Sequence, residues 1–311
     1  MRYSFSTEAN KLIEGFAATR PMHANSLIVS IYGDTICPRG NTIWLGNLIQ
    51  LVAPLGINER LVRTSVFRLA EKNILTSKQI GRRSYYSLTD NAYRQFLSAS
   101  KRIYATHPPT WDGEWRLVIT SLGNLPSEAL EALHKELQWL GFSKIATGVY
   151  AHPSAAIEEV EKLIEETGLD ERIALLKAVA ANANQMPVTN RLIRDSYDLQ
   201  TSDSDYQQLI LEFENIHAST EHAKKLDPKL CFLTRTLLIH RYRHILLKEP
   251  ELPTGIAPES STSKQAKQLV GALYRVISPG ADDYYSSIFG TEAVPVPKPQ
   301  DSYSRRFTED Y

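Results

Sequence analysis

The stretch from residue 58 to residue 88, NERLVRTSVFRLAEKNILTSKQIGRRSYYSL, decides how the rest of the chain is interpreted. Its first half predicts a helix, because apolar residues recur where a turn of about 100° per residue places them on one side. These residues are Leu61, Val62, Val66, Leu69 and Ala70. Asn58 suits the N-cap of this helix, and Glu59 suits its positive first turn. The opposite side is polar, so the helix has one buried and one exposed face.

A two-stranded hairpin is predicted directly after this helix. Beyond Asn73 the pattern changes to β, with strands over Ile74–Ile80 and Ser84–Leu88 and a Gly81-Arg82-Arg83 tip. Upstream, the pattern predicts a helix over Asn25–Gly33, a loop, and a second helix that is capped by Thr42 and ended by Pro54. Downstream, Thr89 is predicted to cap a helix that runs to Arg102. Helix, helix, helix and hairpin is the order of a winged helix-turn-helix domain, which we assign to residues 1–105.

The exposed side of the helix and the hairpin carry groups that bind DNA in other proteins. An arginine can bond a guanine edge twice, and a threonine or serine can bond a phosphate or a base. Basic side chains on the hairpin would reach the adjacent phosphates or the minor groove. The predicted DNA-binding residues are Arg60, Arg63, Thr64, Ser65, Arg68, Lys78, Arg82, Arg83 and Tyr85.

The charge of the chain supports this prediction for its first third only. Residues 1–105 hold 14 Lys and Arg against 6 Asp and Glu, a net charge of +8, and the remainder holds 21 against 29, a net charge of −8. A basic third in a neutral protein points to a polyanionic partner for that third. The competing interpretation is a solvated basic face without a partner, and the order of the elements argues against it.

Two further domains are predicted beyond the paired prolines Pro108 and Pro109. Residues 111–185 alternate strands with helices, which suits a ferredoxin-like α+β domain. Its expected elements are strands over Trp115–Leu122, Ala146–Ala151 and Ile173–Ala181, and helices over Ser127–Leu140 and Ala155–Thr167. The alanines of the last of these strands would also suit a helix. Residues 189–311 are mainly helical and end in a Pro-rich tail, expected to be extended. The fold class is therefore α+β and multidomain.

The resemblance to known families becomes specific in the first domain. RTSVFRL, residues 63–69, resembles the recognition helix of GntR-type winged helix repressors. SLIVSIYGD (26–34), VRTSVFRL (62–69), GRRSYYSLT (81–89) and WDGEWRLV (111–118) are similar to the PaaX family, and the likeness extends over essentially the whole chain. This resemblance implies a repressor of the phenylacetic acid catabolic operon. It also implies a homodimer on a palindromic operator, released by phenylacetyl-CoA.

A basic helix in the last third could meet such an effector. Our hypothesis is that Arg235, Arg241 and Arg243 bind the phosphates of the CoA thioester; the alternative is a basic helix end that balances the helix dipole. His240 and His244 have a spacing that can hold zinc. However, arginine follows the first histidine, where the zincin pattern has glutamate, so no metal site and no cofactor are expected.

Enzymatic classes find little support in the sequence. The runner-up is a CoA-thioester or nucleotide-metabolising enzyme with an accessory DNA-binding domain, but no catalytic set, G-x-G-x-x-G motif or P-loop is present. The central domain resembles a CRISPR spacer-acquisition nuclease, yet its first strand ends Ile119-Thr120-Ser121-Leu122 without a carboxylate to bind a metal. A third class is a protein-binding winged domain. We therefore expect a cytoplasmic, non-enzymatic protein, without a signal peptide or an apolar run of about 18 residues.

Overall fold

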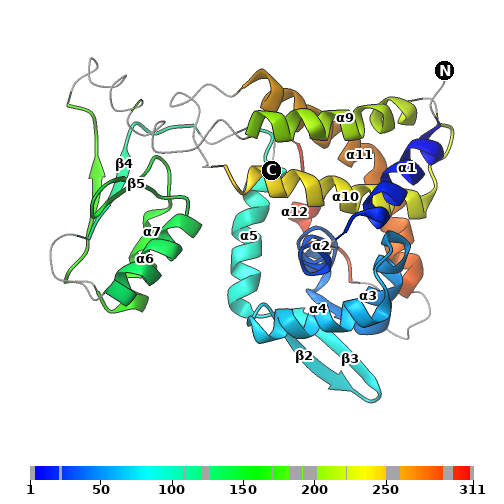
Figure 1. The fold of residues 1–311 in the computed structure, drawn as a ribbon, viewed down its shortest axis with the longest axis horizontal. Helices are drawn as coiled ribbons and strands as arrows, with labels where there is room; N and C mark the ends of the chain where they lie inside the picture. The colour runs from blue at the N-terminus through cyan, green and yellow to red at the C-terminus, as the bar shows by residue number, and fades with distance from the viewer. Residues whose placement is uncertain are drawn as a thin grey trace. The chain divides into compact units, whose positions relative to one another are not determined.

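The structure is a computed structural model, shown in Figure 1, and it divides into two compact units. It describes residues 4–20, 23–107, 110–120, 127–169, 171–181, 191, 202–221, 223–249, 260–289 and 297–308. The first unit comprises Met1–Thr106, Ser204–Leu247 and Thr262–Tyr311, and the central unit comprises His107–Asp203 and Lys248–Ser261. The first predicted segment and most of the last thus belong to one unit, because their buried side chains form one continuous core.

The N-terminal part of the first unit has the predicted helix–hairpin order. Asn58 caps α4 (Glu59–Glu71) by accepting a hydrogen bond from the Leu61 backbone N–H at 2.9 Å, and Thr89 caps α5 (Asp90–Tyr104) in the same way, from Ala92 at 3.3 Å. Both predicted caps are therefore confirmed. The remaining elements are α1 (Phe5–Ala18), α2 (Ala24–Ile31), β1 (Thr42–Trp44), α3 (Leu45–Val52), β2 (Leu75–Ile80) and β3 (Arg83–Leu88).

The segment between α2 and α3 differs from the prediction. The expected loop is helical, as a π-helical turn η1 (Tyr32–Ile36) followed by a 3-10 turn η2 (Cys37–Arg39). Thr42 does not cap α3 but begins strand β1, which pairs with β3 in a three-stranded antiparallel sheet of order β1-β3-β2. The backbone groups of β1 find their partners on β3, about forty residues further along the chain, so local sequence alone could not indicate a strand.

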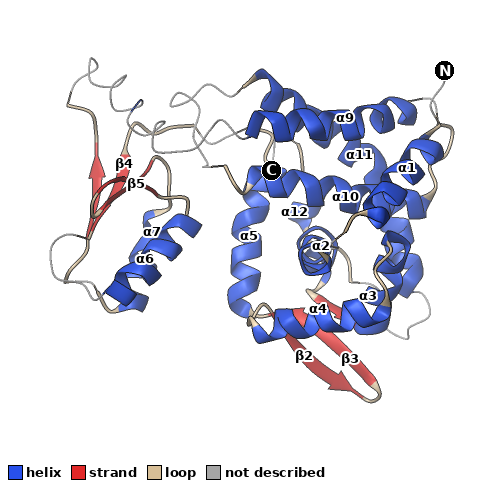
Figure 2. Cartoon of the chain, viewed as in Figure 1, coloured by secondary structure: helices blue, strands red, loops and turns tan. Residues whose placement is uncertain are grey.

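Four helices from the end of the chain complete the first unit, as Figure 2 shows. They are α9 (Ser202–Thr220), α10 (Pro228–Leu246), α11 (Ser261–Phe289) and α12 (Asp301–Ser304). Helix α10 is buried along most of its length and packs against α1, α2 and α5. The expected extended tail instead contains α12, and Phe307 beyond it is buried in the core. There the Phe307 backbone N–H donates to the Tyr104 carbonyl oxygen at 2.9 Å.

The central unit has the β-α-β-β-α-β order of the ferredoxin-like fold. Its elements are β4 (Trp115–Ile119), α6 (Ser127–Trp139), β5 (Ser143–Ala146), β6 (Val149–His152), α7 (Ile157–Thr167) and β7 (Ala174–Ala178). The sheet is antiparallel, with order β5-β6-β4-β7. The single strand expected over Ala146–Ala151 is a hairpin instead, because the chain turns at Gly148, whose φ of 71° suits glycine. Side chains from α6, α7 and the sheet form the core of this unit.

Some predictions lie outside the described residues. They concern the helix over residues 190–200, the end of the strand at Ser121-Leu122, and most of the connection from 249 to 261. Within the described ranges, no helix is long and apolar enough to cross a membrane.

Candidate nucleic-acid interface

Helix α4 separates a buried face from an exposed, basic one. Val62, Val66 and Leu69 are buried in the core of the first unit, and α4 packs against α2 and α3. Apart from Glu59 and Glu71 at its two ends, the exposed residues of the helix are Arg60, Arg63, Thr64, Phe67 and Arg68. In Figure 1 this helix lies at the edge of its unit, with the β2–β3 hairpin projecting beside it. The arrangement presents arginine and threonine side chains on a surface formed by one helix and one hairpin.

Ser65 does not belong to this surface, contrary to the sequence-based prediction. Its exposed fraction is 1%, because it lies three residues after Val62 and four before Leu69, on the buried stripe of α4. Residue type suggested a DNA contact, whereas helical position determines burial. A buried hydroxyl cannot reach a phosphate or a base.

Arg63 and Thr64 are held by the preceding turn of α4. The Arg63 guanidinium donates from Nε and Nη2 to Glu59 Oε1, at 2.9 and 2.6 Å, and the Thr64 hydroxyl donates to the Arg60 carbonyl oxygen at 2.9 Å. The Arg63–Glu59 pair is exposed on both sides, so it contributes at most about 1 kcal/mol and can exchange for another partner. The Arg63 guanidinium is thus exposed to solvent, and its weak pair with Glu59 leaves it able to bind another partner.

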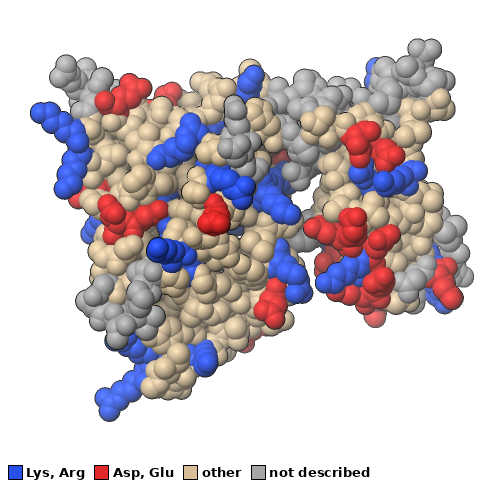
Figure 3. Space-filling model, turned by 180° about the vertical axis from the view of Figure 1, so that it is seen from behind, with Lys and Arg blue, Asp and Glu red and all other residues tan. Residues whose placement is uncertain are grey.

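The hairpin gathers three of the predicted residues on one face of its sheet. Lys78 on β2 lies opposite Tyr85 on β3, and Tyr85 lies opposite Trp44 on β1. Arg83 is two residues from Tyr85 and shares its side of the sheet, and its guanidinium lies 4.4 Å from the centroid of the Trp44 ring. Arg82, at the tip, is exposed. Figure 3 shows basic side chains at this projecting end of the first unit.

Trp44 and Phe67 belong to the surface and were not predicted to. Trp44 supports Arg83, and Gly46 leaves room for its ring, since a Cβ there would lie 2.6 Å from ring carbons. Because the segment of β1 was expected to be helical, the sequence analysis did not place Trp44 beside the hairpin. Phe67 could have been identified from the sequence, because it is an apolar residue on the polar side of a predicted helix.

The three arginines predicted to bind the effector lie in different environments. Arg235 is fully buried and pairs with Asp34 and Asp282, at 3.1 and 2.7 Å, which contradicts the expectation that it meets a ligand phosphate. Arg243 is partly buried and donates to the Ser30 hydroxyl at 2.6 Å, and burial lowers its pKa to about 10. Arg241 alone of the three is exposed, paired with Glu212. Only Arg241 of these three arginines is accessible, so they do not form an exposed cluster.

The two histidines of α10 bond to serines of α2. His240 Nδ1 is 2.9 Å from the Ser30 hydroxyl, and His244 Nε2 is 2.7 Å from the Ser26 hydroxyl. Burial lowers the pKa of His240 to about 3, helped by the neighbouring His244 and Arg243, so its ring is neutral. Within the described residues, no group of three or more potential ligand residues could hold a metal ion.

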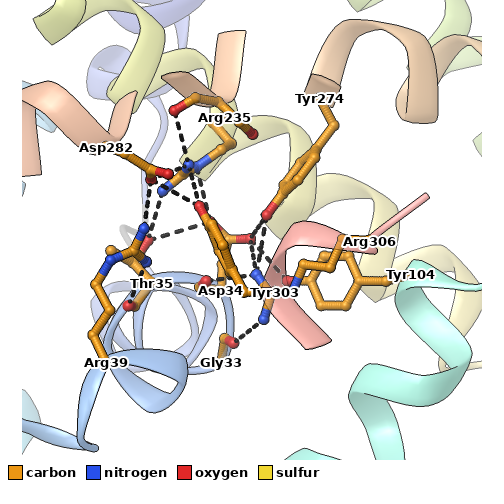
Figure 4. A network of polar contacts seen from close by, with 11 residues as sticks. Gly33, Asp34, Thr35, Arg39, Tyr104, Arg235, Tyr274, Asp282, Tyr303 and Arg306 are labelled. Atoms are coloured by element: carbon orange, nitrogen blue, oxygen red, sulfur yellow. Dashed lines mark hydrogen bonds and ion pairs between the residues drawn. The ribbon is translucent and has the colours of Figure 1, made fainter. Parts of the chain in front are cut away.

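Four buried charged residues of the described chain, Asp34, Arg39, Arg235 and Arg306, form a separate cluster with the partly exposed Asp282, shown in Figure 4. We call Asp34, Arg39, Arg235, Asp282 and Arg306 the buried arginine cluster. Asp34 Oδ1 accepts from the Tyr104 and Tyr274 hydroxyls at 2.8 and 3.0 Å, and Arg306 lies 3.2 Å from the same oxygen. Arg39 pairs with Asp282 at 2.8 Å.

The charge state of Asp34 follows from these contacts. Burial alone would raise its pKa, but Arg235, Arg306 and the two tyrosine hydroxyls hold the pKa below its usual value. Asp34 lies in η1 and Arg39 in η2, which lead directly into β1 and the hairpin sheet. Arg235 comes from α10, Asp282 from α11 and Arg306 from the residues after α12. The cluster therefore joins the part of the unit that carries the basic surface to the C-terminal helices.

Family models and a curated relative match most of the chain. Family models described as "PaaX-like protein", "PaaX protein central Cas2-like domain" and "PaaX-like protein C-terminal domain" match residues 23–92, 108–189 and 197–287. The transcriptional repressor PaaX of Escherichia coli (strain K12) is 34% identical over 288 residues, which cover 92% of this chain and 90% of that protein. The uncharacterized protein Rv0674 from Mycobacterium tuberculosis has a TM-score of 0.47 at 19% identity, covering 77% of this chain and 90% of that one.

Proposed function

Because this chain belongs to the PaaX family, whose E. coli relative is a transcriptional repressor, we propose that it represses transcription by binding operator DNA. The observation that carries the proposal is the exposed face of α4, which presents Arg60, Arg63, Thr64 and Arg68 beside a basic hairpin. In this proposal, the helices α2 to α4 and the β1–β3 sheet form a winged helix-turn-helix domain.

The two parts of the surface have different roles. Helix α4 enters the major groove, where Arg63 and Arg68 bond guanine edges and thereby select sequence. Lys78, Arg82 and Arg83 contact phosphates, which adds affinity on any sequence and makes binding dependent on salt. Trp44 supports the second role by holding the Arg83 guanidinium in place.

A homodimer binds a palindromic operator of the phenylacetic acid catabolic genes, and phenylacetyl-CoA releases it. These finer features rest on the family resemblance. The effector acts through its differential affinity for the operator-bound and free conformations. Of the three arginines considered on α10, Arg241 remains the candidate for an effector phosphate, because its side chain is 54% exposed. The repressor works in the cytoplasm and needs no cofactor for binding DNA.

The experiment that tests this function is footprinting on the gene neighbourhood of the protein, with and without phenylacetyl-CoA. We expect one or two protected sites with two-fold symmetry, a steep loss of affinity with added salt, and release when phenylacetyl-CoA is present. Binding that is uniform along the DNA would contradict a sequence-specific repressor. Protection that persists in saturating phenylacetyl-CoA would contradict only the proposal that phenylacetyl-CoA is the effector.

A further inference from the structure

Phe67 is exposed to solvent and does not pack against the core of the first unit. Its exposed fraction is 62%, the third highest among the exposed large hydrophobic residues of the described chain. The buried side of α4 is already filled by Val62, Val66 and Leu69, and Phe67 does not belong to the hydrophobic cluster that these residues join. A solvent-exposed aromatic ring among arginine side chains does not stabilise the core, and such exposure favours a binding role.

The neighbours of Phe67 define what the ring can contact. On a helix, residues three and four apart are adjacent, so Phe67 lies beside Arg63 and Thr64 on its N-terminal side and beside Ala70 and Glu71 on its C-terminal side. If α4 lies in a major groove, Phe67 faces the edges of base pairs that remain stacked. A ring in that position meets base edges and cannot stack on base planes.

Among the base edges in the major groove, thymine presents an apolar group, the C5 methyl, in contact range of a phenylalanine. Cytosine has hydrogen at this carbon, and the purines present polar N7 and O6 or N6 groups. We propose that Phe67 is a specificity-determining residue that selects thymine through its C5 methyl group. This inference rests on the proposed function, because it places α4 in the groove.

The geometry of the helix also limits where this thymine lies. Arg63 and Phe67 are four residues apart, which is about 6 Å along the axis. Base pairs rise about 3.4 Å each. The thymine should therefore lie one or two base pairs from the guanine that Arg63 binds.

The test removes the methyl group from the DNA and the ring from the protein. Double-stranded DNA that binds the full chain is first selected from a random library, and each thymine of the recovered site is then replaced in turn by deoxyuridine. Deoxyuridine keeps the hydrogen bonds of thymine and lacks only the methyl group. Affinities are measured for the wild-type chain, for Phe67→Ala, and for the control Leu211→Ala, a leucine on α9 with a matched exposed fraction of 63%.

We expect the wild-type chain and Leu211→Ala to lose affinity about fourfold at one thymine, the factor for one methyl group removed from an apolar contact. Phe67→Ala should bind the thymine site about tenfold more weakly and should be indifferent to deoxyuridine, because the interaction partner is gone. Equal sensitivity in wild type and Phe67→Ala, or no sensitive thymine near the Arg63 guanine, would overturn the inference and leave the proposed function intact. Failure of the wild-type chain to select any DNA would overturn both.

Discussion

The basic surface of α4 and its hairpin and the buried arginine cluster use the same side chain in opposite ways. Arg63 on the surface pairs with the carboxylate of Glu59, and because both side chains are exposed to solvent, Arg63 can exchange this partner for another. Arg235 in the cluster is fully buried, with two carboxylates within 3.1 Å. A guanidinium in water can be offered to DNA, whereas a buried one is stable only while its partners remain. The comparison teaches that arginine content alone does not locate a binding site.

The largest effect is expected from removing the carboxylate at the centre of the cluster. Asp34→Asn leaves Arg235 and Arg306 without their shared charge partner, and breaking a buried pair in this way costs about 3–5 kcal/mol. Urea unfolding of the full chain measures the loss, with Glu59→Gln on the surface as the matched control, expected to change stability by at most about 1 kcal/mol. Equal losses in the two variants would remove the distinction between buried and exposed pairs.

The neutral His240 makes stability depend on pH. Its pKa of about 3 in the folded protein is below the usual value of about 6.5, so the unfolded chain binds a proton first as the pH falls. The contribution of His240 to the free energy of unfolding is fully present above about pH 6.5. It declines toward pH 3, by at most about 1.4 kcal/mol per pH unit. Unfolding between pH 7 and 4.5, where Asp34 stays charged, should show a shallower slope in His240→Gln. An unchanged slope would assign the acid sensitivity to other groups.

The exposed arginines of α4 should affect DNA binding and not folding. Arg63→Ala or Arg68→Ala should weaken binding to the selected operator by about 1–3 kcal/mol and lower the preference over unrelated DNA, because a bonded guanine edge is lost. The melting temperature should stay close to that of the wild type. Mobility shifts on operator and scrambled DNA separate the two effects, and parallel weakening on both DNAs would mean that α4 contributes charge alone.

The hairpin arginines should have a smaller and less selective effect. Arg82→Ala/Arg83→Ala should reduce affinity for operator and scrambled DNA by the same factor, and the slope of log affinity against log salt should fall by about 2. Titrations at several salt concentrations measure this slope. Trp44→Leu, which keeps both charges but removes the ring below Arg83, should reproduce part of the loss. A change confined to the operator would show that the hairpin reads bases.

Only a small effect on folding is expected at Arg241, which pairs with Glu212 through a side chain that is 54% exposed. Arg241→Glu should change stability by less than about 1 kcal/mol. If this arginine meets an effector phosphate, calorimetry should show markedly weaker phenylacetyl-CoA binding in Arg241→Glu. Unchanged affinity would place the effector elsewhere. The matched control is Arg275→Glu on α11, a second arginine that is not fully buried and whose guanidinium donates to the Phe307 carbonyl oxygen.

Much of the surface could be predicted because its determinants are local. The N-cap at Asn58, the apolar spacing of α4 and the Gly81 turn of the hairpin all act within a few residues. The sequence also predicted a β-α-β-α-β order for the central unit, which lacks one of the two strands in the β5–β6 hairpin. Errors occurred where partners are distant in sequence, as at strand β1, whose hydrogen bonds go to β3.

The sequence by itself determined where α4 begins, which of its sides is basic, and that the positive charge of the chain lies in its first third. Only the tertiary structure decided which arginines are available. Arg235 and Asp34 are about two hundred residues apart in sequence and meet in the core, and Arg306 joins them from the end of the chain. No local pattern records such a pairing, because the free energy that holds a buried charge depends on the partners that the fold brings to it.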